Sequence, residues 1–159
     1  MSLSIRPGEP ADLLPLTRLW HECKRAAYPY LPLERARALD EDRAFFAERL
    51  LPLELWVAED ESGPVAFLAL EDDCVDRLYV RVDRWRSGAG SALLEHAKAV
   101  RPEGFYLFTH QQNASARAFY EAHGLEVVSF GISPPPESAP DVRYRWRPAT
   151  PSNKGPSRA

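Results

Sequence analysis

The sequence predicts one α/β domain in which a mixed sheet is flanked by helices. Short apolar runs rich in β-branched and aromatic residues alternate with stretches of helical periodicity, and turn-forming residues separate the two. A chain of 159 residues with 45% hydrophobic residues is long enough for one domain with a substantial core. We expect this domain over residues 1–147. The tail, residues 148–159, mixes Pro, Ser, Gly and charge, and we expect it to be disordered.

Composition excludes several classes of function. A net charge of −3 gives no general reason to expect a nucleic-acid partner. The sequence has no apolar run near the roughly 20 residues that span a membrane, and no apolar core of a signal peptide. We therefore expect a cytoplasmic protein without a membrane partner. Cys23 and Cys74 form no disulfide or metal-ligand pattern, so we expect two small buried hydrophobic residues and no metal.

The N-terminal third predicts a short strand and two helices. Residues 3–6 form the strand, and Pro10 begins a helix whose apolar residues share one face. Pro29 and Pro32 end that helix, and a second one follows over residues 33–50.

The remainder alternates strands with helices. Turn formers over residues 60–64 predict a hairpin between the first two strands. We predict helices over residues 91–100 and 113–123, the second closed by Gly124. The predicted strands cover residues 55–59, 65–70, 74–80, 105–109, 125–130 and 142–146.

The turn between strand 74–80 and helix 91–100 is a candidate phosphate site. The first N–H groups of a helix lack internal partners, and Gly88 and Gly90 carry no Cβ that would keep an anion away. Arg84 and Arg86 could add charge-assisted contacts, or could lie solvated beside a tight turn. The proposed cradle consists of the loop amides of Arg86, Ser87, Gly88, Ala89, Gly90 and Ser91.

A second segment makes this turn more informative. The sequence Asn113-x-x-Ala-x-x-Phe119-Tyr120-x-x-x-Gly124 follows it at a fixed distance. Together with Leu78-Tyr79-Val80 and Gly88-Ala89-Gly90, it resembles the two motifs of the GCN5-related N-acetyltransferase (GNAT) superfamily, over about residues 54 to 147. The sequence departs from the family pattern at three positions: Trp85 replaces the usual Gln or Arg, Val82 a common Pro, and Leu125 the usual Phe.

The resemblance implies a fold and a cofactor. The fold would be a curved, mostly antiparallel mixed sheet of about seven strands flanked by about four helices. The cofactor would be acetyl-CoA, with its pyrophosphate in the cradle and its pantetheine arm beside the backbone of Leu78, Tyr79 and Val80, like an added strand. Because Trp85 replaces the usual residue, we expect weaker cofactor binding unless a neighbouring arginine compensates.

The resemblance also assigns roles to two side chains, Tyr120 and Asn113. Tyr120 would protonate the departing thiolate, because a phenol with a pKa near ~10 is protonated at neutral pH. Without the motif around it, Tyr120 would be interpreted as a buried residue that packs beside Phe119. Asn113 is a good N-cap by residue type and would also contact the cofactor arm. Asp76 is our candidate for the proton acceptor of the amine.

Alternatives for that proton acceptor remain. Asp76 lies within the predicted strand, but it would pair with Arg77 by default. The other candidates are Glu71, Asp73, His110 and His123.

The predicted function is direct transfer of an acetyl group from acetyl-CoA to a primary amine of a small molecule or peptide. A non-catalytic acyl-CoA-binding module is the alternative, which only Trp85 favours. A third hypothesis is an acyltransferase that acts on a protein N-terminus or on aminoacyl-tRNA. In the family the N-terminal helices wall the acceptor cleft, so Tyr28 and Tyr30 are candidate acceptor contacts or caps of the core. The family's curved sheet often pairs two copies, so the resemblance also allows a homodimer.

Overall fold

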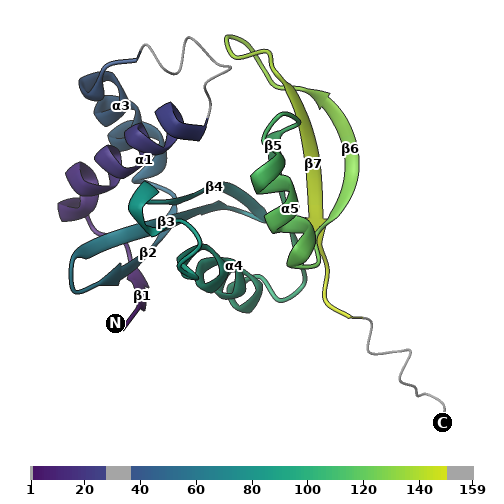
Figure 1. Ribbon diagram of the computed structural model, residues 1–159, viewed down its shortest axis with the longest axis horizontal. Helices are drawn as coiled ribbons and strands as arrows, with labels where there is room; N and C mark the ends of the chain where they lie inside the picture. Colours follow the sequence, from purple (N-terminus) through teal and green to yellow (C-terminus); the bar gives the residue numbers. More distant parts are fainter. Residues whose placement is uncertain (1, 28–36, 150–159) are drawn as a thin grey trace.

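The fold is a single seven-stranded sheet with helices on both faces, as the sequence predicts (Figure 1). The computed structural model describes residues 2–27 and 37–149. Tyr28 and Tyr30 and most of the predicted tail lie outside the described residues. The strands are β1 (Ser4–Pro7), β2 (Glu54–Asp60), β3 (Gly63–Glu71), β4 (Cys74–Val80), β5 (Phe105–His110), β6 (Glu126–Ile132) and β7 (Pro140–Trp146). The helices are α1 (Leu13–Ala27), α3 (Leu39–Phe45), α4 (Ala89–Val100) and α5 (Ala114–Ala122), with short helical turns at Pro10–Asp12, Phe46–Leu50 and Val82–Arg84.

The strands follow the order β1-β2-β3-β4-β5-β7-β6. Every neighbouring pair is antiparallel except β4 and β5, which are parallel. A parallel pair needs a crossover connection, and α4 supplies it. The predicted mixed, mostly antiparallel sheet is therefore confirmed.

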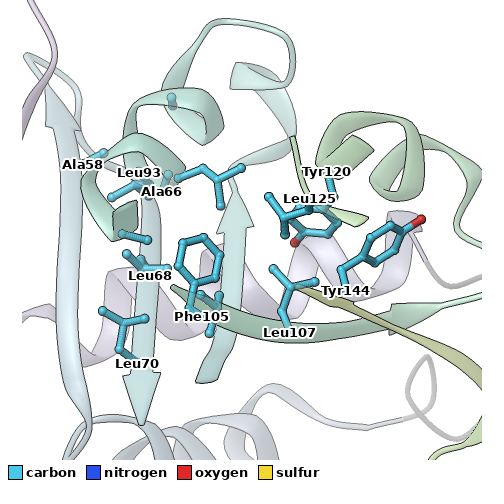
Figure 2. Packing of buried hydrophobic residues seen from close by; sticks show 14 of the residues in the cluster. Ala58, Ala66, Leu68, Leu70, Leu93, Phe105, Leu107, Tyr120, Leu125 and Tyr144 are labelled. Carbon is cyan, nitrogen blue, oxygen red and sulfur yellow. The ribbon is translucent and has the colours of Figure 1, made fainter. Parts of the chain in front are cut away.

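Two hydrophobic clusters lie on opposite faces of the sheet. One packs α1 and α3 against β2 and β3 through residues such as Leu16, Phe46 and Phe67. The other packs α4 and α5 against the sheet and includes Leu68, Leu93 and Tyr144 (Figure 2). Alternate strand residues feed the two clusters, because successive side chains of a strand point to opposite faces. Both faces of β3 are consequently buried.

The second N-terminal helix differs from the prediction. Within the described residues it begins at Leu39, and its last five residues form a π-helical turn, Phe46–Leu50. Glu41 accepts a hydrogen bond from the backbone N–H of Ala38 at 2.8 Å, which fixes the first turn. Asp42, fully buried, binds Lys24 of α1 at 3.0 Å and so joins the two helices.

The first helix begins differently as well. Pro10–Asp12 form a 3-10 turn, and the α-helix itself starts at Leu13. Asp12 explains the extra turn, because its carboxylate accepts the N–H of Glu9 at 2.8 Å and binds the guanidinium of Arg6. No helix among the described residues is long and apolar enough to cross a bilayer.

Candidate active site

The candidate site lies where β4 and β5 separate. The two parallel strands pair only through Cys74 with Tyr106 and Val75 with Leu107. The next residue, Asp76, forms a β-bulge. Two consecutive residues of β3 pair with Val75 and Arg77, so Asp76 has no partner on β3. Beyond the bulge β4 has no pairing with β5, so one edge of β4 faces the space between the two strands.

The backbone groups at this open edge belong to Leu78 and Val80. The N–H of Arg81 donates to the carbonyl of Val65 on β3 at 2.7 Å. Because backbone groups alternate in direction along an antiparallel strand, Tyr79 also faces β3, and Leu78 and Val80 face the opening. The role of Leu78 and Val80 as backbone partners of a cofactor stays a prediction. The backbone of Tyr79 pairs with Phe67, and its ring stacks on the ring of Phe67 at 5.9 Å.

The first turn of α4 lies against the end of β4. A Cβ on Gly90 would meet the side chain of Val80 at 3.3 Å and that of Phe119 at 3.4 Å, so a glycine allows β4, α4 and α5 to converge here. Gly88 has a different function: it is the N-cap of α4 with φ +96°, in the left-handed region. It has no side chain to cap the helix, so the first N–H groups of α4 remain available to an anion.

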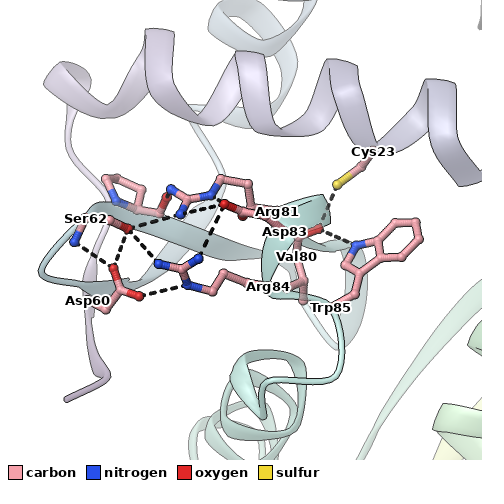
Figure 3. A network of polar contacts seen from close by, with 9 residues as sticks. Cys23, Asp60, Ser62, Val80, Arg81, Asp83, Arg84 and Trp85 are labelled. Atoms are coloured by element: carbon pink, nitrogen blue, oxygen red, sulfur yellow. Dashed lines mark hydrogen bonds and ion pairs between the residues drawn. The ribbon is translucent and has the colours of Figure 1, made fainter. Parts of the chain in front are cut away.

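The arginines around the loop are not equivalent. Arg84, which the sequence suggested for a phosphate, instead binds Asp60 at the end of β2 at 3.1 Å and donates to the hydroxyl of Ser62 in the β2–β3 turn (Figure 3). The hydroxyl and backbone N–H of Ser62 lower the pKa of Asp60 to about 2, with a smaller contribution from Arg84. The guanidinium of Arg84 is therefore engaged within the protein. Arg86, with φ +65°, is exposed at the loop itself.

Asn113 and Tyr120 occupy the predicted positions on α5. The side chain of Asn113 accepts the N–H of Ala116 at 3.1 Å, which confirms it as the N-cap. Tyr120 is 8% exposed and packs against Phe119 and Tyr144, with ring centroids 5.3 and 5.9 Å away. In Figure 2 the hydroxyl groups of Tyr120 and Tyr144 point in different directions. The hydroxyl of Tyr144 is held by Glu121 and Arg117.

Burial governs the acidity of Tyr120. Loss of hydration disfavours the phenolate and raises the pKa of Tyr120 well above its usual value of 10.0, with a smaller contribution from Tyr79. The phenol is therefore protonated throughout the neutral and mildly alkaline range, as a proton donor must be.

Asp76 lies in a small pocket on the other side of β4. Its carboxylate binds the guanidinium of Arg77 at 3.1 Å, the pairing that the sequence suggested as the default. Asp76 lines a pocket of about 130 Å³. The other lining residues come from α3 and the chain that follows it up to β2, from the end of β3 and from β4: Phe45, Arg49, Leu50, Leu53, Glu71 and Arg77. Asp73 is exposed and does not line this pocket.

The two candidate histidines have different surroundings. Nε2 of His110, at the end of β5, lies 3.0 Å from the carboxylate of Glu137 in the β6–β7 loop. Hydrogen bonding from His110 lowers the pKa of Glu137, with smaller contributions from Ser133 and Arg77. His123 instead contacts the hydroxyl of Ser91 at 3.0 Å and so joins the end of α5 to the start of α4.

Sequence reasoning missed several residues of the site. Glu137 and the pocket residues Phe45 and Arg49 carry no local motif; only the tertiary structure brings Glu137 to His110 of β5 and the pocket residues to Asp76. Cys23 is another: its thiol donates to the carbonyl of Val80 at 2.8 Å, although the residue lies on α1. Among the described residues, no group of three or more His, Cys, Asp or Glu side chains is arranged to bind a metal ion.

Comparison with known proteins finds similarity over the part of the chain that contains this site. Residues 52–127 match a family model described as an acetyltransferase (GNAT) domain. The peptidyl-lysine N-acetyltransferase YjaB of Escherichia coli (strain K12) is 32% identical over 130 residues, which cover 80% of this chain and 85% of that protein.

Solved structures agree in fold. The solution structure of apo-form YjaB from Escherichia coli has a TM-score of 0.78 and 27% identity, covering 91% of this chain and 97% of that chain. The Thermoplasma acidophilum PaiA N-acetyltransferase, solved in complex with coenzyme A, has a TM-score of 0.69 and 19% identity, with 92% and 99% covered. The protein yncA from Salmonella typhimurium, solved with its cofactor acetyl-CoA, has a TM-score of 0.64 and 18% identity, with 95% and 98% covered.

Proposed function

Because the chain belongs to the GCN5-related N-acetyltransferase family, we propose that it transfers an acetyl group from acetyl-CoA directly to a primary amine. The chain is an N-acetyltransferase by family. The observation that best supports this proposal is that β4 separates from β5 at Asp76, with the first turn of α4 packed against Val80. The opening offers backbone groups to an extended ligand, and the helix start offers N–H groups to an anion.

The loop before α4 is the proposed pyrophosphate site. Gly88 leaves the helix start uncapped, and the N–H groups of Ala89, Gly90 and Ser91 belong to its first turn. The helix dipole adds positive potential there. Arg86 is the arginine placed to add a charge-assisted contact, because Arg84 is bound to Asp60.

The open edge of β4 is the proposed site of the pantetheine arm. Leu78 and Val80 would pair with its amides as a neighbouring strand would, and a backbone N–H there would polarise the thioester carbonyl. Asn113 caps α5 and, as the family resemblance implies, would add a contact to the arm.

Tyr120 and Asp76 are the proposed proton donor and acceptor. Burial keeps the Tyr120 phenol protonated, so it can donate to the departing sulfur. Asp76, at the bulge, would take the proton of the amine directly or through water, and Arg77 holds its carboxylate in place. Tyr120 lies on α5 and Asp76 lies on β4. The proton donor for the sulfur and the proton acceptor for the amine would therefore come from different elements.

The proposed acceptor is the side-chain amine of a peptidyl lysine. Support comes from the relatives named as peptidyl-lysine N-acetyltransferases in Escherichia coli and Salmonella typhimurium. The pocket at Asp76 combines the apolar Leu50 and Leu53 with the carboxylates of Asp76 and Glu71. Arg49 and Arg77 also line it, so the two carboxylates would have to bind the lysine ammonium beside these guanidinium groups.

The test combines calorimetry with a thiol-release assay. Stoichiometric binding of acetyl-CoA, followed by lysine-peptide-dependent release of CoA and a mass increase of the peptide by one acetyl group, is the expected result. Binding without release for a broad panel of amines would favour the non-catalytic module. No binding at millimolar acetyl-CoA would overturn the proposal.

A further inference from the structure

The carbonyl of Val80 is already occupied by two side chains of the protein. The indole N–H of Trp85 donates to it at 2.7 Å, and the thiol of Cys23 donates to it at 2.8 Å (Figure 3). A backbone carbonyl has two lone pairs. Both are used here, at the position where the open edge of β4 would otherwise accept a ligand N–H.

The two donors differ in how readily they can leave. Cys23 on α1 is 1% exposed and belongs to the hydrophobic cluster between α1 and the sheet. Burial raises the pKa of its thiol to about 12. Trp85 is 47% exposed, and no aromatic neighbour packs on its ring among the described residues. The half-exposed indole can therefore move toward solvent, whereas displacing Cys23 would disturb the core.

The chain just before Trp85 is held firmly. Arg84 binds Asp60, and Arg81 binds Asp83 at 2.6 Å while its backbone N–H pairs with Val65. The backbone N–H of Trp85 itself donates only weakly, to Val82 at 3.3 Å. A fixed segment that ends in a half-exposed indole lets the side chain move while the phosphate loop stays in place.

We propose that Trp85 closes the pantetheine site in the free protein and that acyl-CoA binds by displacing its indole from Val80. The inference rests on the proposed function, because the competing donor is a pantetheine amide at the open edge of β4. It also accounts for a tryptophan where the family has Gln or Arg: the residue regulates access along the strand rather than binding the pyrophosphate. Trp85 is thus a group that sets cofactor affinity.

The first test follows the indole directly. The Trp85 indole ¹H–¹⁵N signal is identified by its absence from the spectrum of Trp85→Phe, and the protein is titrated with CoA and, separately, with 3′-phospho-ADP. The second ligand carries the phosphates of CoA without the pantetheine arm. CoA is expected to shift the Trp85 signal, and 3′-phospho-ADP to leave it in place. Equal shifts with both ligands would overturn the inference.

The second test measures affinity with a matched control. Trp85→Phe removes the indole donor, so CoA is expected to bind about two- to tenfold more tightly, the value of one net hydrogen bond. Affinity for 3′-phospho-ADP should not change. Trp56→Phe is the control, because Trp56 on β2 also loses an indole hydrogen bond, to Glu54 at 2.9 Å, away from the opening.

The outcomes separate this inference from the proposed function. Equal or weaker CoA binding by Trp85→Phe, with wild-type binding intact, overturns the inference alone. Failure of the wild type and of Trp85→Phe to bind CoA overturns both. Tighter CoA binding by Trp85→Phe than by the wild type, with unchanged affinity for 3′-phospho-ADP, supports both.

Discussion

The carboxylate of Asp76 lies 3.1 Å from the guanidinium of Arg77, its neighbour at the bulge of β4. Both side chains are 30% exposed, so the pair adds at most about 1 kcal/mol to stability. The position of the pair, next to the separation of β4 and β5, matters more. A carboxylate held there could accept the proton of the amine substrate.

Exchange of Asp76 tests the base. If Asp76 takes the proton of the amine, Asp76→Asn should lower kcat/KM about 10²- to 10⁴-fold while acetyl-CoA binding persists. Arg77→Gln is the matched control, since it breaks the same ion pair and keeps the carboxylate. Equal losses in the two variants would mean that the ion pair, and not the carboxylate, is what the reaction needs.

Tyr120→Phe tests the acid. The variant keeps the ring that packs on Phe119 and Tyr144 and loses only the proton donor. Turnover should fall about 10²- to 10⁴-fold, and the Kd of acetyl-CoA should stay within about twofold. Stopped-flow thiol release and calorimetry measure the two quantities, and turnover at the wild-type level would remove Tyr120 from the mechanism.

The same residue predicts a pH dependence of stability. Because burial raises the pKa of Tyr120 above 10.0, the folded state holds the phenolic proton more tightly than the unfolded chain does. This stabilisation is complete below about pH 10 and is lost as the pH rises from there through the folded pKa. The wild-type free energy of unfolding, from urea titrations, should therefore fall more steeply than that of Tyr120→Phe above about pH 10. Parallel curves would contradict the buried phenol.

Two arginines of the loop should behave differently. Arg86→Gln should weaken CoA binding about three- to tenfold at low salt, with the difference shrinking as salt rises. Arg84→Gln should leave CoA binding unchanged, because Arg84 binds Asp60 and Ser62 instead. Isothermal titration at two ionic strengths measures both variants, and a larger loss with Arg84→Gln would reverse the assignment.

Asn113 can be divided into its two roles. Asn113→Ala should cost about 1 kcal/mol of stability, because the first turn of α5 loses its cap. Asn113→Ser keeps a capping oxygen, so its stability should match the wild type within a few tenths of a kcal/mol. If Asn113 also contacts the cofactor, both variants should bind acetyl-CoA more weakly; wild-type affinity in Asn113→Ser would limit the residue to capping.

The sequence by itself determined the local features. Strand 74–80 agrees with β4 at both ends, and Asn113 caps α5 as its residue type predicts. Apolar periodicity, turn residues and helix caps are short-range properties, so they can be read from neighbouring residues. The proposed phosphate loop belongs to the same group, since a strand, two glycines and a helix start follow one another in the chain.

Only the tertiary structure decided how distant residues meet. The bulge at Asp76 depends on pairing with β3, the pocket combines α3 with β4, and Glu137 reaches His110 from a loop. Trp85 looked in the sequence like the loss of a phosphate contact. The fold instead places its indole, together with the thiol of Cys23 on α1, on the carbonyl of Val80. Such contacts depend on strand register and helix packing, which no local pattern encodes.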